Sequence, residues 1–141
     1  MVRWLGLIVL VTIASLVPGP ATADDLGDAN TILCTASIAT LCLEDGECET
    51  GPPWNWNIPQ FIEIDFAAKQ LRTTKASGEN RSTAIKNLQR EDGLIFLQGV
   101  EKGRAFSFVI TEKTGLSSVA VARDGVTVSG FGACTPIEGR R

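Results

Sequence analysis

The strongest constraint on the fold comes from the stretch between Gly103 and Cys134, where apolar residues recur at every second position between glycine-containing turns. Side chains two residues apart lie on the same face of a β-strand, and Phe106, Phe108 and Ile110 have this spacing. An Asp-Gly pair readily adopts the positive φ angles of a tight hairpin turn. The stretch therefore predicts three consecutive antiparallel strands.

The positions of the turns predict which residues face one another. A two-residue loop at Asp124-Gly125 places Val121 opposite Val128, and a two-residue loop at Thr114-Gly115 places Phe108 opposite Val121. Earlier turns continue the pairing, so that the large side chains share one face and the alternate positions are small or mildly polar. The earlier turns are Lys102-Gly103 and Asp92-Gly93, and the predicted apolar face comprises Leu88, Ile95, Leu97, Phe106, Phe108, Ile110, Val119, Val121 and Val128.

The N-terminal segment, residues 1–23, has the composition of a signal peptide. Arg3 precedes an uncharged apolar segment, Trp4 to Leu16, and Ala21-Thr22-Ala23 is a cleavage site of the A-x-A type. A membrane anchor is the alternative, but the apolar segment is shorter than the roughly 20 residues that cross a bilayer. We expect cleavage before Asp24, no membrane span in the product, and a periplasmic or secreted location.

A single domain is predicted after the signal helix: a flexible lead-in at 24–31, a β domain at 32–137 and a polar tail at 138–141. Of the 13 basic residues Arg3 leaves with the signal, so 12 basic and 16 acidic residues remain and the net charge is −4. This balance argues against nucleic acid and anionic membranes, which both attract basic surfaces. A cationic protein or a glycan remains as a possible class of partner.

Four cysteines remain in the exported chain. Oxidising compartments favour disulfides, and an even count leaves no thiol over. Of the three possible pairings we favour Cys42–Cys48 with Cys34–Cys134, because a three-residue loop at 44–46 sets Cys42 opposite Cys48. Zinc is the alternative, but the spacing is not Cys-x-x-Cys and the chain has no histidine. We therefore predict no metal and no cofactor.

Shorter strands are predicted elsewhere in the domain. The segment 61–66 alternates strictly, with Ile62, Ile64 and Phe66 toward the core. Prolines rule out a central strand at 51–59, which we expect to be an extended surface loop. About eight strands in one domain predict an all-β fold, a small antiparallel meander closed as a barrel or a sandwich. The further predicted strands are 32–43, 70–74 and 83–89.

No catalytic signature is present. Without histidine, the Ser-His-Asp and Cys-His arrangements are excluded, and we predict that the protein is not an enzyme. Glu63 and Asp65 are spaced like the carboxylates of retaining glycosidases, but a solvated outer face is the more common reason for such a pair. A Lys or Arg opposite them would indicate ion pairing.

Trp54 and Trp56 are the candidate ligand-binding residues. On an extended loop they lie on the same side and offer flat apolar faces to sugars or to a partner protein. Alternatively, one or both cap an open end of the barrel. The sequence thus predicts a non-enzymatic binding or inhibitor module, or an envelope component, with carbohydrate or peptidoglycan binding through Trp54 and Trp56 as the alternative.

One pattern of cysteines and strand residues extends over most of the chain after residue 23: Cys34, Cys42-Leu-Glu-Asp-Gly-Glu-Cys48, Phe61-Ile-Glu-Ile-Asp65 and Phe131-Gly-Ala-Cys134. With this pattern the chain resembles a family of small exported proteins common in alphaproteobacteria, which implies a periplasmic location and no particular activity. In architecture alone it is also similar to periplasmic inhibitors of c-type lysozyme, which are small disulfide-bonded β-barrels. It lacks the Ser-Gly-x-x-Tyr loop of those inhibitors and has no tyrosine.

Overall fold

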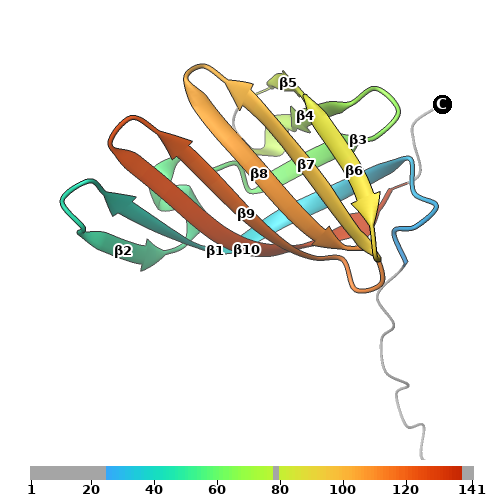
Figure 1. The fold of residues 1–141 in the computed structure, drawn as a ribbon, viewed down its shortest axis with the longest axis horizontal. Helices are drawn as coiled ribbons and strands as arrows, with labels where there is room; N and C mark the ends of the chain where they lie inside the picture. Colours follow the sequence, from blue (N-terminus) through green and yellow to red (C-terminus); the bar gives the residue numbers. More distant parts are fainter. Residues whose placement is uncertain (1–24, 78–79, 138–141) are drawn as a thin grey trace, which may run out of the picture.

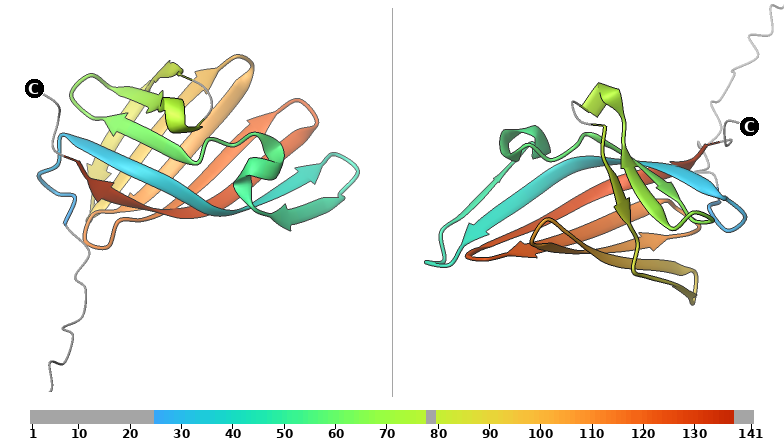
Figure 2. Two further views of the ribbon diagram at one scale, coloured as in Figure 1. Left: turned by 180° about the vertical axis from the view of Figure 1, so that it is seen from behind. Right: turned by 90° about the horizontal axis from the view of Figure 1, so that it is seen from above.

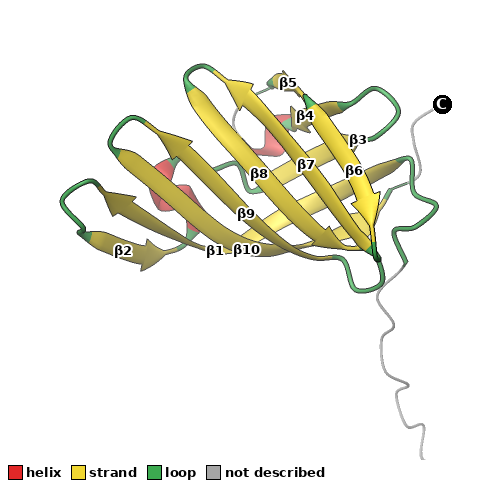
Figure 3. Ribbon diagram, in the orientation of Figure 1, coloured by secondary structure: helices red, strands yellow, loops and turns green. Residues whose placement is uncertain are grey.

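The computed structural model describes residues 25–77 and 80–137, so the predicted signal peptide and the C-terminal tail lie outside the described residues. Within them, no helix has the length and hydropathy needed to cross a membrane. In the described residues, two short 3₁₀ helices interrupt the connections between the strands (Figure 3). The elements are β1 (Thr31–Leu43), β2 (Cys48–Gly51), η1 (Pro53–Trp56), β3 (Phe61–Asp65), β4 (Gln70–Thr73), η2 (Lys75–Ser77), β5 (Ser82–Ala84), β6 (Asn87–Glu91), β7 (Leu94–Glu101), β8 (Arg104–Thr111), β9 (Leu116–Arg123) and β10 (Val126–Pro136).

The strands form one antiparallel sheet in the order β5-β4-β3-β1-β10-β9-β8-β7-β6, with β2 paired to β1 outside this path (Figure 1). The sheet curls into a half-barrel, so that β3, β4 and β5 lie across from β6, β7 and β8 (Figure 2). The predicted all-β fold is confirmed. The sequence did not distinguish a barrel from a sandwich, and the half-barrel of the structure is nearer to the barrel.

Strand β1 organises the curl because its two edges have different partners. One edge pairs with β10 along the whole strand, with a register shift between Ala36 and Ile38. The other edge pairs with β3 over residues 31–35 and with β2 over residues 39–42. The sheet therefore has two halves that meet at the middle of β1. In the covered half, next to residues 31–35, β3 and the strands after it lie over the concave face; the half next to residues 39–42 is the open half.

Three of the four predicted hairpin turns are confirmed, including the turn that places Val121 opposite Val128. The predicted pairing of Phe108 with Val121 is wrong, because Phe108 faces Val119. The loop between β8 and β9 has four residues, 112–115, and the N–H of Gly115 donates to the carbonyl of Thr111 at 2.8 Å. A shift of two residues keeps every side chain on its predicted face.

The single strand predicted at 83–89 is two strands, β5 and β6. Between them Ile85 is buried, and its N–H donates to the carbonyl of Lys69 at 2.8 Å. The N–H of the next residue, Lys86, donates to the carbonyl of Gln98 at 2.8 Å. Two successive residues thus bond to opposite edges of the sheet, Ile85 to the loop before β4 and Lys86 to β7. This connection brings the two edges of the curled sheet together.

The core lies inside the curl and includes a residue of the predicted lead-in. Leu26 is 0% exposed, and its N–H donates to the carbonyl of Glu112 at 2.9 Å. The guanidinium of Arg90 donates to the carbonyl of Gly27 at 2.8 Å. This segment therefore belongs to the folded domain, although the sequence predicted only a lead-in there. The buried apolar residues are Leu26, Ile32, Cys34, Ala39, Ile64, Phe66, Leu71, Ile85, Ile95, Leu97, Phe108, Ile110 and Cys134.

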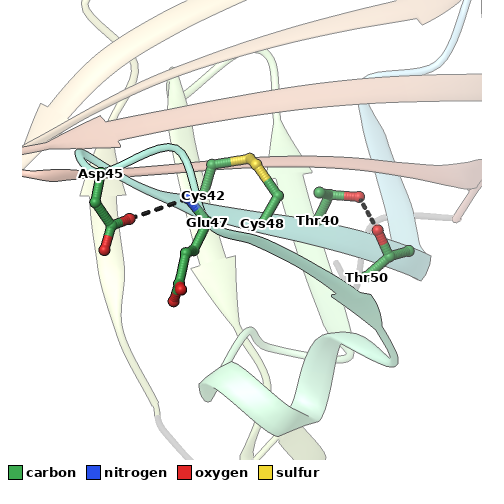
Figure 4. Close-up of a disulfide and its surroundings, with 6 residues drawn as sticks. All are labelled: Thr40, Cys42, Asp45, Glu47, Cys48 and Thr50. Atoms are coloured by element: carbon green, nitrogen blue, oxygen red, sulfur yellow. Dashed lines mark hydrogen bonds between the residues drawn. A yellow bond between two sulfur atoms is a disulfide. The ribbon is translucent and has the colours of Figure 1, made fainter.

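Both predicted disulfides are confirmed. Cys34 and Cys134 are directly paired between β1 and β10, and their bridge joins the first long strand to the last. Cys42 faces Cys48 across the hairpin of β1 and β2 (Figure 4). The predicted three-residue loop is also present, with Gly46 at φ 89°. Two disulfides indicate an oxidising environment outside the cytoplasm.

Candidate functional site

The concave face of the open half of the sheet forms an apolar groove of about 260 Å³. Its floor consists of two rows of side chains that run across four neighbouring strands. No side chain in either row carries a hydrogen-bonding group. The first row is Leu41, Val128, Val121 and Phe106, and the second row is Ala39, Gly130, Val119 and Phe108.

The groove exists because two features leave space above these rows. First, β3 pairs only with residues 31–35 of β1, so none of the strands in the described residues lies over the open half. Second, the second row has small residues at the end that lies on β1 and β10: Ala39 and Gly130 face each other. A Cβ atom at position 130 would lie 3.0 Å from the carbonyl oxygen of Ile38 and 3.4 Å from a methyl carbon of Val119. A side chain at position 130 would therefore crowd β1 and β9, and its absence leaves space in the groove.

The opposite wall of the groove comes from η1 and the residues after it, including Trp56 and Ile58. The expected extended loop is wrong in this respect, because Pro53–Trp56 form a 3₁₀ helix that ends at Asn57 in the left-handed conformation. A proline at the first helical turn suits this start, since its missing N–H needs no partner there.

The two tryptophans do not share a side, as the extended loop had implied. A 3₁₀ helix has three residues per turn, so positions two apart point in different directions. Trp54 is 62% exposed, whereas Trp56 is half-buried and lines the groove. Whether either binds a ligand stays a prediction.

A charged rim flanks the first apolar row, on the side away from the second row. Glu101, Arg104 and Arg123 come from three successive strands, β7, β8 and β9, and all three line the groove. The guanidinium of Arg104 donates to the carboxylate of Glu101 at 3.4 Å, and Arg81 lies 4.0 Å from the same carboxylate. Among the described residues that line the groove, three are arginines and one is a glutamate, so the rim is positively charged. The whole chain, by contrast, has a net charge of −3.

The carboxylate pair on β3 lies outside the groove lining. Arg72 faces Glu63 on the neighbouring strand and lies 3.2 Å from Glu63 and 3.3 Å from Asp65. This is the ion pairing that the sequence analysis set as the alternative to a catalytic pair. In residues 25–77 and 80–137, no group of three or more His, Cys, Asp or Glu side chains is placed to hold a metal ion.

Sequence reasoning missed the arginines of the rim. Arg104 and Arg123 occupy the predicted apolar face, two residues from Phe106 and Val121. They lie one step beyond Ala105 and Ala122, which form a register pair. The two-residue loop predicted between these strands put Arg104 opposite position 125, so the error in register separated the two arginines.

The chain matches no protein-family model and no curated protein.

Proposed function

We propose that this protein is an exported, non-enzymatic binding or inhibitor module, located in the periplasm or secreted, whose ligand lies in the apolar groove. The observation that carries the proposal is the pair of apolar rows left without a covering strand. Ligand sites are typically concave and apolar, with a few polar groups that set the orientation. The groove has this composition, with its charged groups gathered at one rim.

Export is supported by the two disulfides and by the composition of the N-terminal segment. The resemblance to exported alphaproteobacterial proteins supports the periplasm of a Gram-negative bacterium as the finer location. The absence of histidine supports a role without acid–base catalysis at neutral pH, since histidine is the side chain that titrates there without perturbation.

The proposal is tested with an uncharged apolar dye, N-phenyl-1-naphthylamine, titrated into the mature, disulfide-bonded protein. We expect one dye per protein and a rise in dye fluorescence on binding. Val128→Phe adds a ring to the first row and should weaken dye binding at least tenfold. Val121→Phe, in the same row, replaces it if the first variant melts at a lower temperature.

Leu116→Phe is the control, because Leu116 is 62% exposed on β9 and lies outside the groove. It should bind the dye as the unsubstituted protein does. Equal binding by the groove variants and the control would contradict the assignment of the ligand to the groove, and so would a lack of any dye binding by the unsubstituted protein.

Carbohydrate binding through Trp54 and Trp56 is the second candidate, and the exposure of Trp54 supports it. Aromatic side chains are enriched where proteins bind their partners. If this candidate is right, Trp54→Ala should reduce retention on peptidoglycan with no change in melting temperature. The same variant should leave dye binding in the groove unchanged, which separates the two candidates.

A further inference from the structure

We infer that the groove binds a single-chain amphiphile with an anionic head group, its alkyl tail on the two apolar rows and its head held by Arg104 and Arg123. This inference rests on the proposed function and specifies its ligand. It draws on three observations: the charges at the rim, the absence of polar groups on the floor, and the volume of the groove.

The charges at the rim are arranged for an anion. Arg104 and Arg123 occupy equivalent positions at the ends of two adjacent strands, one step beyond a register pair. Like charges in facing positions of a sheet repel each other unless an opposite charge lies between them. Glu101 supplies one carboxylate to Arg104, whereas the side chain of Arg123 has no ion-pair partner among the described residues. A ligand anion would complete this arrangement.

The floor of the groove accepts only the apolar part of a ligand. Its eight positions carry aliphatic or aromatic side chains or none at all, so a sugar lying there would lose its hydrogen bonds to water without replacement. The charged groups lie along one side of the first row, one step beyond Phe106 on β8 and Val121 on β9. A ligand that satisfies both regions has an anionic group at one end and an apolar tail.

The volume limits the length of that tail. An apolar cavity of about 150 Å³ holds one benzene molecule, which has six non-hydrogen atoms, so by proportion a groove of about 260 Å³ holds about ten atoms. This corresponds to a single medium-length chain. A lipid with two long chains does not fit, so we expect an alkyl carboxylate or an alkyl phosphate with one chain.

Isothermal titration of the mature, disulfide-bonded protein tests the inference with four probes built on a chain of eight carbon atoms, which in octanoate includes the carboxylate carbon: octanoate, octyl phosphate, octanol and octyltrimethylammonium. Hydrogen bonds to charged groups predict that an anionic probe binds at least about tenfold more tightly than octanol. We expect no detectable binding of the cationic probe. In a series of alkyl carboxylates, each added methylene should raise the affinity about fourfold until the groove is full, near nine or ten atoms.

Arg104→Gln and Arg123→Gln should each weaken octanoate binding about tenfold or more and leave octanol binding unchanged. Arg104→Lys, which keeps the charge, should recover part of the loss and serves where the glutamine variant is less stable. Lys113→Gln is the control, because it makes the same change in net charge in the exposed loop after β8. It should not change the affinity for octanoate.

The possible results separate the inference from the proposed function. Tighter binding of octyl phosphate than of octanoate would identify the head group as a phosphate, and the reverse order as a carboxylate; either supports an anionic amphiphile. Equal binding of octanol and octanoate, unchanged by the arginine variants, would overturn the inference and leave the groove as a site for uncharged ligands. If no probe binds and the uncharged dye also fails to bind, both the inference and the proposed function are contradicted.

Discussion

Replacing Phe108 by alanine tests the side-chain assignment on which the core and the groove both depend. Phe108 is 7% exposed, lies between Leu97 and Val119 in the register, and meets the ring of Phe106 edge-on at 6.1 Å. Truncating a buried phenylalanine costs about 3–5 kcal/mol, depending on how far the site collapses or refills. Because Phe108 also borders the groove, water can enter the space left by the ring. We therefore expect a loss in the free energy of unfolding of about 3 kcal/mol, at the lower end of that range.

Ser107→Ala is the matched control, since Ser107 is the preceding residue and points to the convex face opposite Ala120 and Gln98. It should change the stability by less than about 0.5 kcal/mol. With an unfolding entropy of ~2.1 cal/mol/K per residue over roughly 110 residues, these losses lower the melting temperature by about 13 °C and by less than about 2 °C.

The assay is urea unfolding of the disulfide-bonded protein, followed by tryptophan fluorescence, with thermal melts alongside. A large effect at Ser107 and a small one at Phe108 would mean that the strand faces the other way. Large effects at both positions would mean that the convex face is covered as well, and the half-barrel would no longer describe the protein in solution.

Two further predictions concern stability. Replacing both cysteines of the Cys34–Cys134 bridge by alanine should lower the free energy of unfolding by about 4–5 kcal/mol, and the same change at Cys42–Cys48 by about 2 kcal/mol. The first bridge closes a much longer loop and so removes more conformational entropy from the unfolded chain. Equal losses in urea unfolding would contradict this account. Leu26→Ala should cost about 2–5 kcal/mol in the same assay, since this side chain is fully buried; unchanged stability would mean that the segment is only a lead-in, as the sequence suggested.

Local rules predicted much of the sheet correctly because each acts over a few residues. Asp-Gly and Lys-Gly pairs defined three hairpins, and strict alternation defined which side chains of β7 to β10 face inward. The short disulfide followed from turn geometry alone, because a three-residue loop places Cys42 opposite Cys48. The second disulfide then followed by pairing the cysteines that remained.

The register of β8 and β9 could not be predicted by the same rules. A loop of two residues and a loop of four residues put the same side chains on the apolar face, so hydrophobic alternation does not choose between them. The choice depends on Gly115, whose φ is 68° and whose N–H closes the longer loop onto Thr111. The arginine pair of the rim depends on this choice, and the sequence therefore did not reveal the site.

The curl of the sheet was also beyond local reasoning, because it depends on how the edges of β1 are shared. Had β3 continued along β1, it would have covered the open half of the sheet, and the barrel would have had a filled interior. Instead β2 takes the edge of β1 from Ala39 to Cys42, and the Cys42–Cys48 bridge fixes it there.

This hairpin contributes little to the core, since residues 48–50 are exposed and its disulfide closes only a short loop. Its structural effect is to satisfy the backbone groups at an edge that would otherwise be open to pairing with another strand. The backbone groups of residues 39–42 at the edge of β1 are thereby paired, and no strand of the described part of the chain passes over the concave face there. An apolar groove can then remain accessible next to a fully buried core, within a domain of one sheet.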